Sequence, residues 1–168
     1  MDTQTLTLRR TTPADLAALD QLYSRSYPNL LKADYPPSTL VMALPLIARA
    51  QPRLLASGSF YLVESDGEPV GAGGWSWGGP QGGASPTHMA HVRHLVTDHR
   101  RVRQGIARRL MGHVLAEAKA AGARILDCQS TLTAVPFYAS LGFREVGPIL
   151  IQLRPGIEFP AVRMQKVL

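Results

Sequence analysis

Hydrophobic positions along the chain change their spacing several times, from alternation to helical repeats and back. Residues 5–10 alternate polar and apolar side chains, a pattern that predicts a strand. Residues 12–27 predict a helix, because their leucines recur at helical spacing behind a threonine and a proline, which are typical of a helix start. Residues 36–50 predict a second helix that Pro45 kinks.

The rest of the chain continues the mixture of strands and helices. The segments 59–65 and 69–77, separated by "DGE", predict a hairpin, and residues 78–87 predict a flexible Gly- and Pro-rich loop. A single α/β domain over residues 1–168 is therefore expected. The later elements expected are a strand over 88–97, a helix from Ile106 ending at Gly122, a strand over 123–131, a short helix over 134–142, and strands over 143–153 and 158–168.

The net charge indicates the class of ligand more clearly than the overall composition does. The 168 residues include 18 Lys and Arg against 12 Asp and Glu, a net charge of +6, which suggests a polyanionic ligand such as nucleic acid, an anionic membrane or a phosphorylated small molecule. One cysteine, Cys128, excludes an internal disulfide, and the N-terminal residues do not resemble a signal peptide. The apolar stretch 40–48 is too short to span a bilayer. We expect a cytoplasmic protein without membrane contact.

The basic residues concentrate where a predicted strand turns into a predicted helix, in "DHRRVRQGIARR". A helix N-terminus presents unpaired N–H groups and the positive end of the dipole, and Gly105 lets a ligand approach the backbone. This turn therefore predicts a phosphate cradle. The chain has no Gly-Lys pair for a P-loop, and "GAGGWSW" lies inside a hairpin strand, which excludes a dinucleotide fingerprint. Five arginines surround the cradle: Arg100, Arg101, Arg103, Arg108 and Arg109.

Two motifs together resemble the GNAT superfamily of N-acetyltransferases. The stretch "VRQGIA", residues 102–107, is similar to the family's acyl-CoA signature, and "TLTAVPFYASLGF", residues 131–143, is similar to its next motif. Val102 replaces the usual Gln or Arg, and Thr131 replaces the common Asn, although a threonine can also cap a helix.

The resemblance implies a mixed α+β fold, with a mostly antiparallel sheet of about seven strands flanked by about four helices. It also implies acetyl-CoA as co-substrate, no metal, and direct acetyl transfer to a primary amine in a ternary complex. The strand "HLV" would part from its neighbour and leave amides free for the thioester. The residues expected to bind acetyl-CoA are Leu95, Val96, Arg101, Arg103, Gln104, Gly105, Ile106, Ala107, Arg108, Thr131 and Phe137.

Catalytic roles follow from the same resemblance. Tyr138 occupies the position from which family members direct a phenol at the CoA sulfur, so we expect it to protonate the departing thiolate. His91 stands eleven residues before Val102, where several members place a glutamate that draws off the amine proton through water. A histidine can serve as that base near neutral pH, and ordered water is the alternative. The spacing of His88, His91 and His94 does not suit a metal, because a strand cannot make them converge.

The acceptor is less defined. Tyr27, Trp75 and Trp77 are the aromatic residues expected to line its site, with packing on the second helix as the competing interpretation of the tryptophans. A small amine, an antibiotic or a protein N-terminus all remain open. Alternatives to an enzyme are a catalytically silent CoA-binding module and a nucleic-acid binder; the latter lacks a second helix after Gly122. The apolar C-terminal strands leave a homodimer open.

Overall fold

A two-residue turn organises the first half of the sheet. In the computed structural model, which describes residues 5–168, Asp66 and Gly67 have φ of 50° and 79°. Left-handed conformations at both central positions define the tight turn that suits the twist of a hairpin. The turn joins β2 (Phe60–Ser65) to β3 (Glu68–Ser76), as the sequence predicts.

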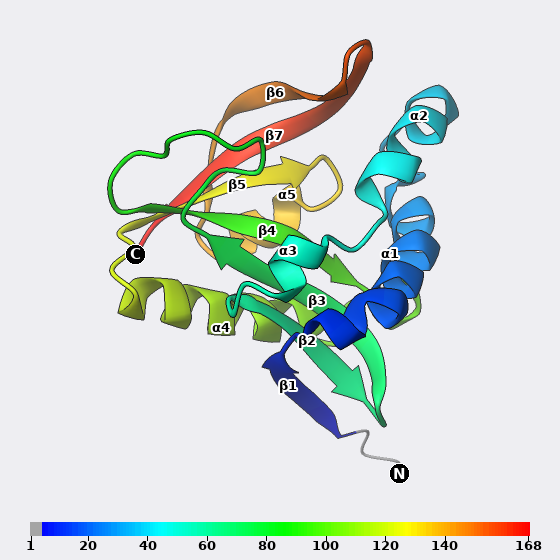
Figure 1. Cartoon of the computed structure of the whole chain (residues 1–168). Helices are drawn as coiled ribbons and strands as arrows, with labels where there is room; N and C mark the ends of the chain where they lie inside the picture. The colour runs from blue at the N-terminus through cyan, green and yellow to red at the C-terminus, as the bar shows by residue number, and fades with distance from the viewer. Residues whose placement is uncertain (1–4) are drawn as a thin grey trace.

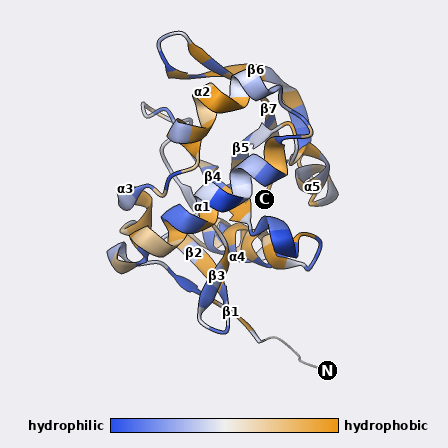
Figure 2. Cartoon of the chain, turned by 90° about the vertical axis from the view of Figure 1, so that its right-hand side faces the viewer, coloured by the Kyte–Doolittle hydropathy of each residue, from blue (hydrophilic) through white to orange (hydrophobic). Residues whose placement is uncertain are grey.

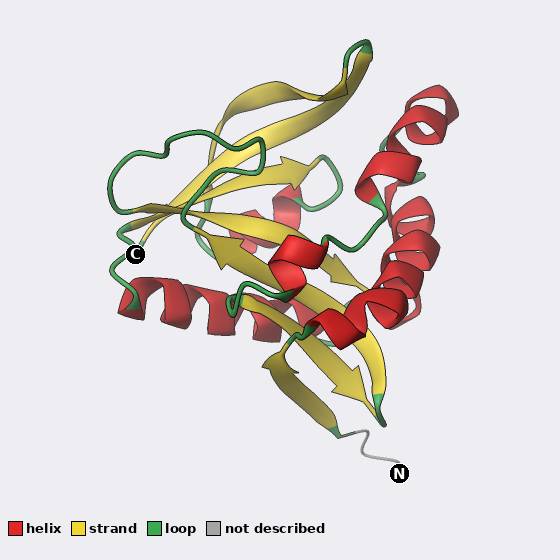
Figure 3. Ribbon diagram, in the orientation of Figure 1, coloured by secondary structure: helices red, strands yellow, loops and turns green. Residues whose placement is uncertain are grey.

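Seven strands form one sheet in the order β1-β2-β3-β4-β5-β7-β6 (Figures 1 and 3). Every neighbouring pair is antiparallel except β4 and β5, which run parallel. The mostly antiparallel mixed sheet expected from the sequence is therefore confirmed. The remaining strands are β1 (Leu6–Arg10), β4 (Met89–Thr97), β5 (Ile125–Thr131), β6 (Arg144–Arg154) and β7 (Ile157–Val167).

The helices cover both faces of the sheet and divide the core in two. On one face, α1, α2 and α3 pack with Leu62, Ala72 and Val96. On the other face, α4 and α5 pack with Val92 and Leu126. Figure 2 shows hydrophobic and hydrophilic residues interleaved along these elements, as burial of one face requires. The helices are α1 (Leu16–Leu31), α2 (Pro37–Ile47), α3 (Pro52–Leu55), α4 (Ile106–Ala120) and α5 (Val135–Ser140).

The predicted order of elements agrees with the structure, with differences at the ends of helices. The first helix begins with a 3-10 turn at Pro13–Asp15 and continues to Leu31, past Pro28. The short helix α3 was not predicted, so the α-helices number five rather than about four. Within residues 5–168, no helix is both long and apolar enough to cross a membrane.

The parallel strands β4 and β5 pair over only three positions. Met89, Ala90 and His91 lie opposite Ile125, Leu126 and Asp127, and beyond this point the strands separate. On its other side β4 carries a bulge, because Gly74 pairs with Arg93 and Ala72 with Val96. Two residues of β4, His94 and Leu95, therefore stand opposite Gly73, and His94 adopts a φ of 52°. The separation and the bulge together open the sheet at its centre.

Gly74 on β3, next to this opening, is packed too closely to accept a side chain. A Cβ at Gly74 would lie 2.3 Å from the Ser59 carbonyl oxygen and 2.7 Å from the Phe60 Cα, both backbone atoms. We predict that Gly74→Ala lowers the free energy of unfolding by about 1–3 kcal/mol in urea denaturation. Gly112→Ala, in the middle of α4 with no neighbour within 4 Å, should be neutral or stabilising. Equal stability of Gly74→Ala and the parent would contradict the packing described.

Candidate functional site

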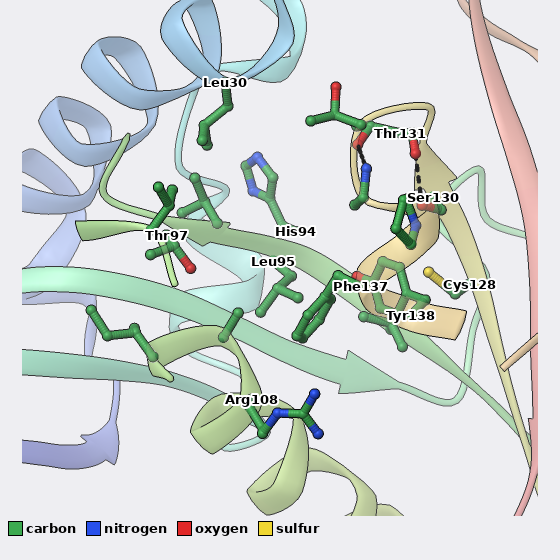
Figure 4. A pocket seen from close by; sticks show the side chains of 18 of the residues that line it. Leu30, His94, Leu95, Thr97, Arg108, Cys128, Ser130, Thr131, Phe137 and Tyr138 are labelled. Atoms are coloured by element: carbon green, nitrogen blue, oxygen red, sulfur yellow. Dashed lines mark hydrogen bonds between the residues drawn. The ribbon is translucent and has the colours of Figure 1, made fainter. Parts of the chain in front are cut away.

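A cavity of about 790 Å³ occupies the gap between the separated strands. Its walls come from β4, β5, the N-terminal turn of α4, α5 and the end of α1 (Figure 4). No aspartate or glutamate lines it among the described residues. Eleven of the residues singled out from the sequence line this cavity: Tyr27, Leu95, Val96, Arg103, Gly105, Ile106, Ala107, Arg108, Thr131, Phe137 and Tyr138.

The turn into α4 has the geometry of an anion cradle. Gly105 is the N-cap with φ of 80°, and Arg103 is also left-handed at 64°. No side chain caps the helix, so its first amides, beginning with Ile106, have no partner within the helix. A Cβ at Gly105 would meet no atom within 4 Å, which leaves space for a ligand against the backbone. These features fit the phosphate-bearing part of a CoA thioester.

A buried carboxylate fixes the strand-to-helix turn. Asp98 is fully buried and accepts hydrogen bonds from the backbone and side chain of Arg100, with Arg25 at 3.3 Å. The Arg100 guanidinium, in spite of desolvation, holds the pKa of Asp98 well below its usual range. Arg109 donates to the Leu6 carbonyl. Arg100 therefore supports the turn, and Arg109 ties α4 to β1. Arg103 and Arg108 line the cavity, whereas Arg101 and Gln104 do not.

The bulge in β4 is held from α1 by tyrosines. The Tyr23 hydroxyl donates to the His94 carbonyl at 2.7 Å, and the Tyr27 hydroxyl donates to the Leu95 carbonyl at 3.4 Å. The Tyr23 ring also stacks on the His94 imidazole, with centroids 3.8 Å apart. These contacts stabilise the left-handed backbone of His94, which a histidine adopts only at some cost.

His94 lines the cavity in a defined tautomer. Its Nε2 lies 2.8 Å from the Ile47 carbonyl, and because a carbonyl only accepts, Nε2 carries the proton. Nδ1 is then an acceptor, and it is buried without a hydrogen-bond partner among the described residues. Burial lowers the pKa of His94 to about 4, so the ring is neutral at pH 7. Sequence reasoning missed this residue, since alternation alone does not reveal a bulge.

Tyr138 and Cys128 meet at the floor of the cavity. Both line it and both are buried. Burial raises the pKa of Cys128 to about 12 and that of Tyr138 well above its usual value. Both groups are therefore protonated at neutral pH. Thr131, at the end of β5, accepts a hydrogen bond from the Ala134 amide at 3.2 Å and so caps the turn that leads to α5.

His91 lies outside the residues that line the cavity. Its Nε2 is 2.9 Å from the Ser85 hydroxyl, and its Nδ1 is 3.4 Å from the Asp127 carboxylate. Burial lowers the pKa of His91 in spite of the nearby carboxylate. The imidazole is thus neutral at pH 7 and held away from the cavity.

The three aromatic residues predicted to line the acceptor site do not lie together. Tyr27 lines the cavity, whereas Trp75 and Trp77 do not. Trp75 is buried in the core beside α4, and Trp77 is largely exposed and meets it edge-on at 5.6 Å. The tryptophans therefore pack on each other rather than on the second helix or in the cavity.

Comparison with known proteins identifies the family. Residues 43–168 match the family described as "Acetyltransferase (GNAT) domain", which is most of the chain. The chain belongs to this family of acetyltransferases. None of the curated proteins matches the sequence significantly.

Solved structures share the fold over the whole chain. A GCN5-related N-acetyltransferase from Rhodopseudomonas palustris superposes with a TM-score of 0.80 at 20% identity, covering 100% of this chain and 99% of that one. PaiA N-acetyltransferase from Thermoplasma acidophilum, in complex with coenzyme A, gives 0.67 at 12% identity, covering 98% and 99%. YncA from Salmonella typhimurium, with acetyl-CoA, gives 0.66 at 16% identity, covering 98% and 94%. At these identities the likeness establishes the fold.

The geometry of the turn at Gly105 predicts how a substitution there changes the binding of acetyl-CoA. Gly105→Glu should abolish binding of acetyl-CoA, because a side chain and a negative charge would enter the phosphate site. A saturating ligand at 100 times its Kd adds about 2.7 kcal/mol, so acetyl-CoA should raise the Tm of the parent by several degrees and leave the variant unchanged.

Two variants separate charge from strain in that experiment. Gly105→Ala imposes the left-handed backbone on an L side chain without charge, so it should lower the unliganded Tm but keep a shift with acetyl-CoA. Gly112→Glu adds the same charge to an exposed part of α4 and should respond like the parent. An unchanged affinity in Gly105→Glu would remove the cradle from the site.

His94 predicts a pH dependence of stability. Its pKa is lowered to about 4 in the folded chain, against about 6.5 unfolded. Its contribution is therefore complete above pH 6.5 and is lost as the pH falls from about 6.5 towards 4. His94→Asn should flatten the fall of Tm across this window, whereas His88→Asn, at an exposed site with a similar φ of 63°, should not. Parallel pH profiles for His94→Asn and the parent would contradict a neutral buried His94.

Proposed function

We propose that the chain transfers the acetyl group of acetyl-CoA to an amine by direct transfer in a ternary complex. The observation that carries this proposal is the single cavity that joins the helix N-terminus at Gly105 to the buried phenol of Tyr138 through the gap between β4 and β5. A pantetheine arm is long and narrow, and such a gap suits it. The GNAT relatives with coenzyme A or acetyl-CoA bound support the choice of co-substrate.

The phosphates would bind at the start of α4. The free amides of Ile106 and Ala107 and the dipole of the helix favour the pyrophosphate, and Arg103 and Arg108 add charge at the same mouth. Arg108 is held by a 3.1 Å hydrogen bond to the Ser140 hydroxyl, which orients its guanidinium. Backbone N–H groups donate hydrogen bonds whatever side chain they carry. A valine at position 102 can therefore replace a polar residue here.

The thioester would lie along β4. Beyond His91 this strand has no partner on the side facing β5, so its N–H groups on that side lack the hydrogen bonds of a sheet. The Asp98 amide donates to Val70, and Val96 pairs with Ala72, so alternation turns the Val96 N–H toward β3. We therefore assign the backbone of Leu95, which lines the cavity, to binding the thioester and its developing oxyanion.

Tyr138 would complete the transfer. The amine nitrogen attacks the acetyl carbonyl, the C–S bond breaks, and the sulfur takes a proton from the Tyr138 hydroxyl. The raised pKa keeps this phenol protonated until the thiolate forms. Cys128 lies beside it with a pKa of about 12, which excludes a thiolate nucleophile in the resting protein.

Proton removal from the incoming amine would run through water. His91, the base expected from the sequence, does not line the cavity, so it receives the proton only through an intervening water. The imidazole of His94 lines the cavity, but its Nδ1 is buried. Its pKa of about 4 makes it too weak a base to keep the proton. The acceptor itself would be a small amine or a peptide N-terminus.

The test is Tyr138→Phe. It should lower kcat by about 10²–10⁴-fold while the KM for acetyl-CoA stays near the parental value, as measured by thiol release. Tyr61→Phe, another buried tyrosine of the same core, is the matched control and should keep kcat. A full kcat in Tyr138→Phe would remove it as the acid. Binding of acetyl-CoA without turnover on any amine would favour a catalytically silent CoA-binding module.

A further inference from the structure

Polar side chains surround the point where β4 and β5 part, on the face opposite α4. The last paired positions there are His91 and Asp127, whose side chains approach to 3.4 Å and so share a face. Two residues further along each strand, Arg93 and Gln129 fall on the same face, because side chains alternate. Arg93 and Gln129 therefore flank the apex of the opening, and Gln129 lines the cavity.

Arg93 carries a positive charge that has no carboxylate partner within residues 5–168. Its guanidinium donates to two neutral oxygens, at 3.1 Å to the Ser76 hydroxyl and at 3.4 Å to the Gln51 amide. A guanidinium has five N–H donors, so three remain without a partner among the described residues. The side chain is partly buried, and desolvation lowers its pKa. A desolvated charge of this kind gains most from an anion.

Several other arginines have carboxylate partners, whereas Arg108 and Arg109 donate to a hydroxyl and a carbonyl oxygen. The nearest comparison is Arg163, which shares the face of Arg93 and donates to Asp127 at 2.8 Å. Asp127 also accepts from Gln165 at 2.9 Å, so its charge is already engaged. The other pairs are Arg9 with Asp15 and Glu64, Arg10 with Glu117, and both Arg25 and Arg100 with Asp98 and Glu68.

Arg93 is not part of the phosphate cradle. It lies four residues before the end of β4, roughly 13 Å along the strand from Thr97, and the cradle begins beyond that end. Unlike Arg103 and Arg108, Arg93 is not among the residues that line the cavity. Its neighbours in sequence, Val92 and His94, line the cavity, and its guanidinium is hydrogen-bonded to Ser76 and Gln51. The two basic sites therefore serve different ligands.

We propose that Arg93 binds a carboxylate of the acceptor, so that the acceptor is an amine that also carries a carboxylate, of the amino-acid class. This inference rests on the proposed acetyl transfer and names its second substrate. Ser76 and Gln51 hold the guanidinium while leaving donors for a planar carboxylate, which a guanidinium can bind through two parallel hydrogen bonds. The amine of the same molecule would then reach the thioester beside His94 and Leu95.

The experiment compares free amino acids with their primary amides as acceptors at saturating acetyl-CoA, by thiol release. Amidation removes the carboxylate and keeps the amine. We expect the parent to favour the free acid by about 10–100-fold in kcat/KM, the range for a charge-assisted hydrogen bond. Arg93→Gln should raise the KM for the free acid by a similar factor and abolish the preference, with the KM for acetyl-CoA unchanged.

Matched variants make the result specific. Arg144→Gln removes an exposed arginine on β6 and should retain the preference. Arg93→Lys keeps the charge without the planar fork and should give an intermediate preference. Equal use of acids and amides by the parent, or an unchanged preference in folded Arg93→Gln, would overturn the inference and leave the acetyl transfer intact. Intact binding of acetyl-CoA with no turnover on either set would overturn the proposed function as well.

Discussion

The separation of β4 from β5 is the constraint on which the rest of the structure depends. Ending the pairing after His91 and Asp127 leaves backbone groups near the centre of the protein without sheet partners. Buried backbone groups need replacements. Tyrosine hydroxyls supply two of them, because Tyr23 donates to the His94 carbonyl and Tyr27 donates to the Leu95 carbonyl. Tyr35 has a similar role where the pairing of β5 with β7 ends, since it accepts from the Leu132 amide at 2.9 Å and donates to the Pro160 carbonyl at 2.6 Å.

This arrangement gives α1 a role beyond covering the sheet. Tyr23 and Tyr27 lie one helical turn apart, so one face of α1 presents both hydroxyls to consecutive carbonyls of the bulge. Their rings meanwhile belong to the apolar core beside Leu19 and Leu22. The opening is thus maintained by side chains that are themselves fixed by packing, a condition for a site that must hold its geometry before a ligand arrives.

The sequence could predict the features that depend on residues close together in the chain. The cradle at Gly105 depends on a strand-turn-helix pattern within a few residues, and the position of Tyr138 depends on a contiguous motif, so both were visible. The bulge at His94 was not, because it depends on the register of β3 against β4. The same holds for the contact of His91 with Asp127, which brings residues from separate strands together. Alternation placed Trp75 correctly on a strand, but β3 ends at Ser76, before Trp77, and the pattern could not show that the two rings contact each other.

The placement of charge also bears on how the amine loses its proton. Under the proposed function, the amine would arrive in a cavity that residues 5–168 line with two arginines and no carboxylate, and the charge of Arg93 acts on His94 in its wall. Nearby positive charge and desolvation both disfavour an ammonium ion, so each lowers the pKa of the bound amine. Such a site increases the neutral, nucleophilic fraction without a strong base. The proposed chemistry requires an uncharged amine nitrogen. Such a site supplies one even though His94 is a weak base and His91 does not line the cavity.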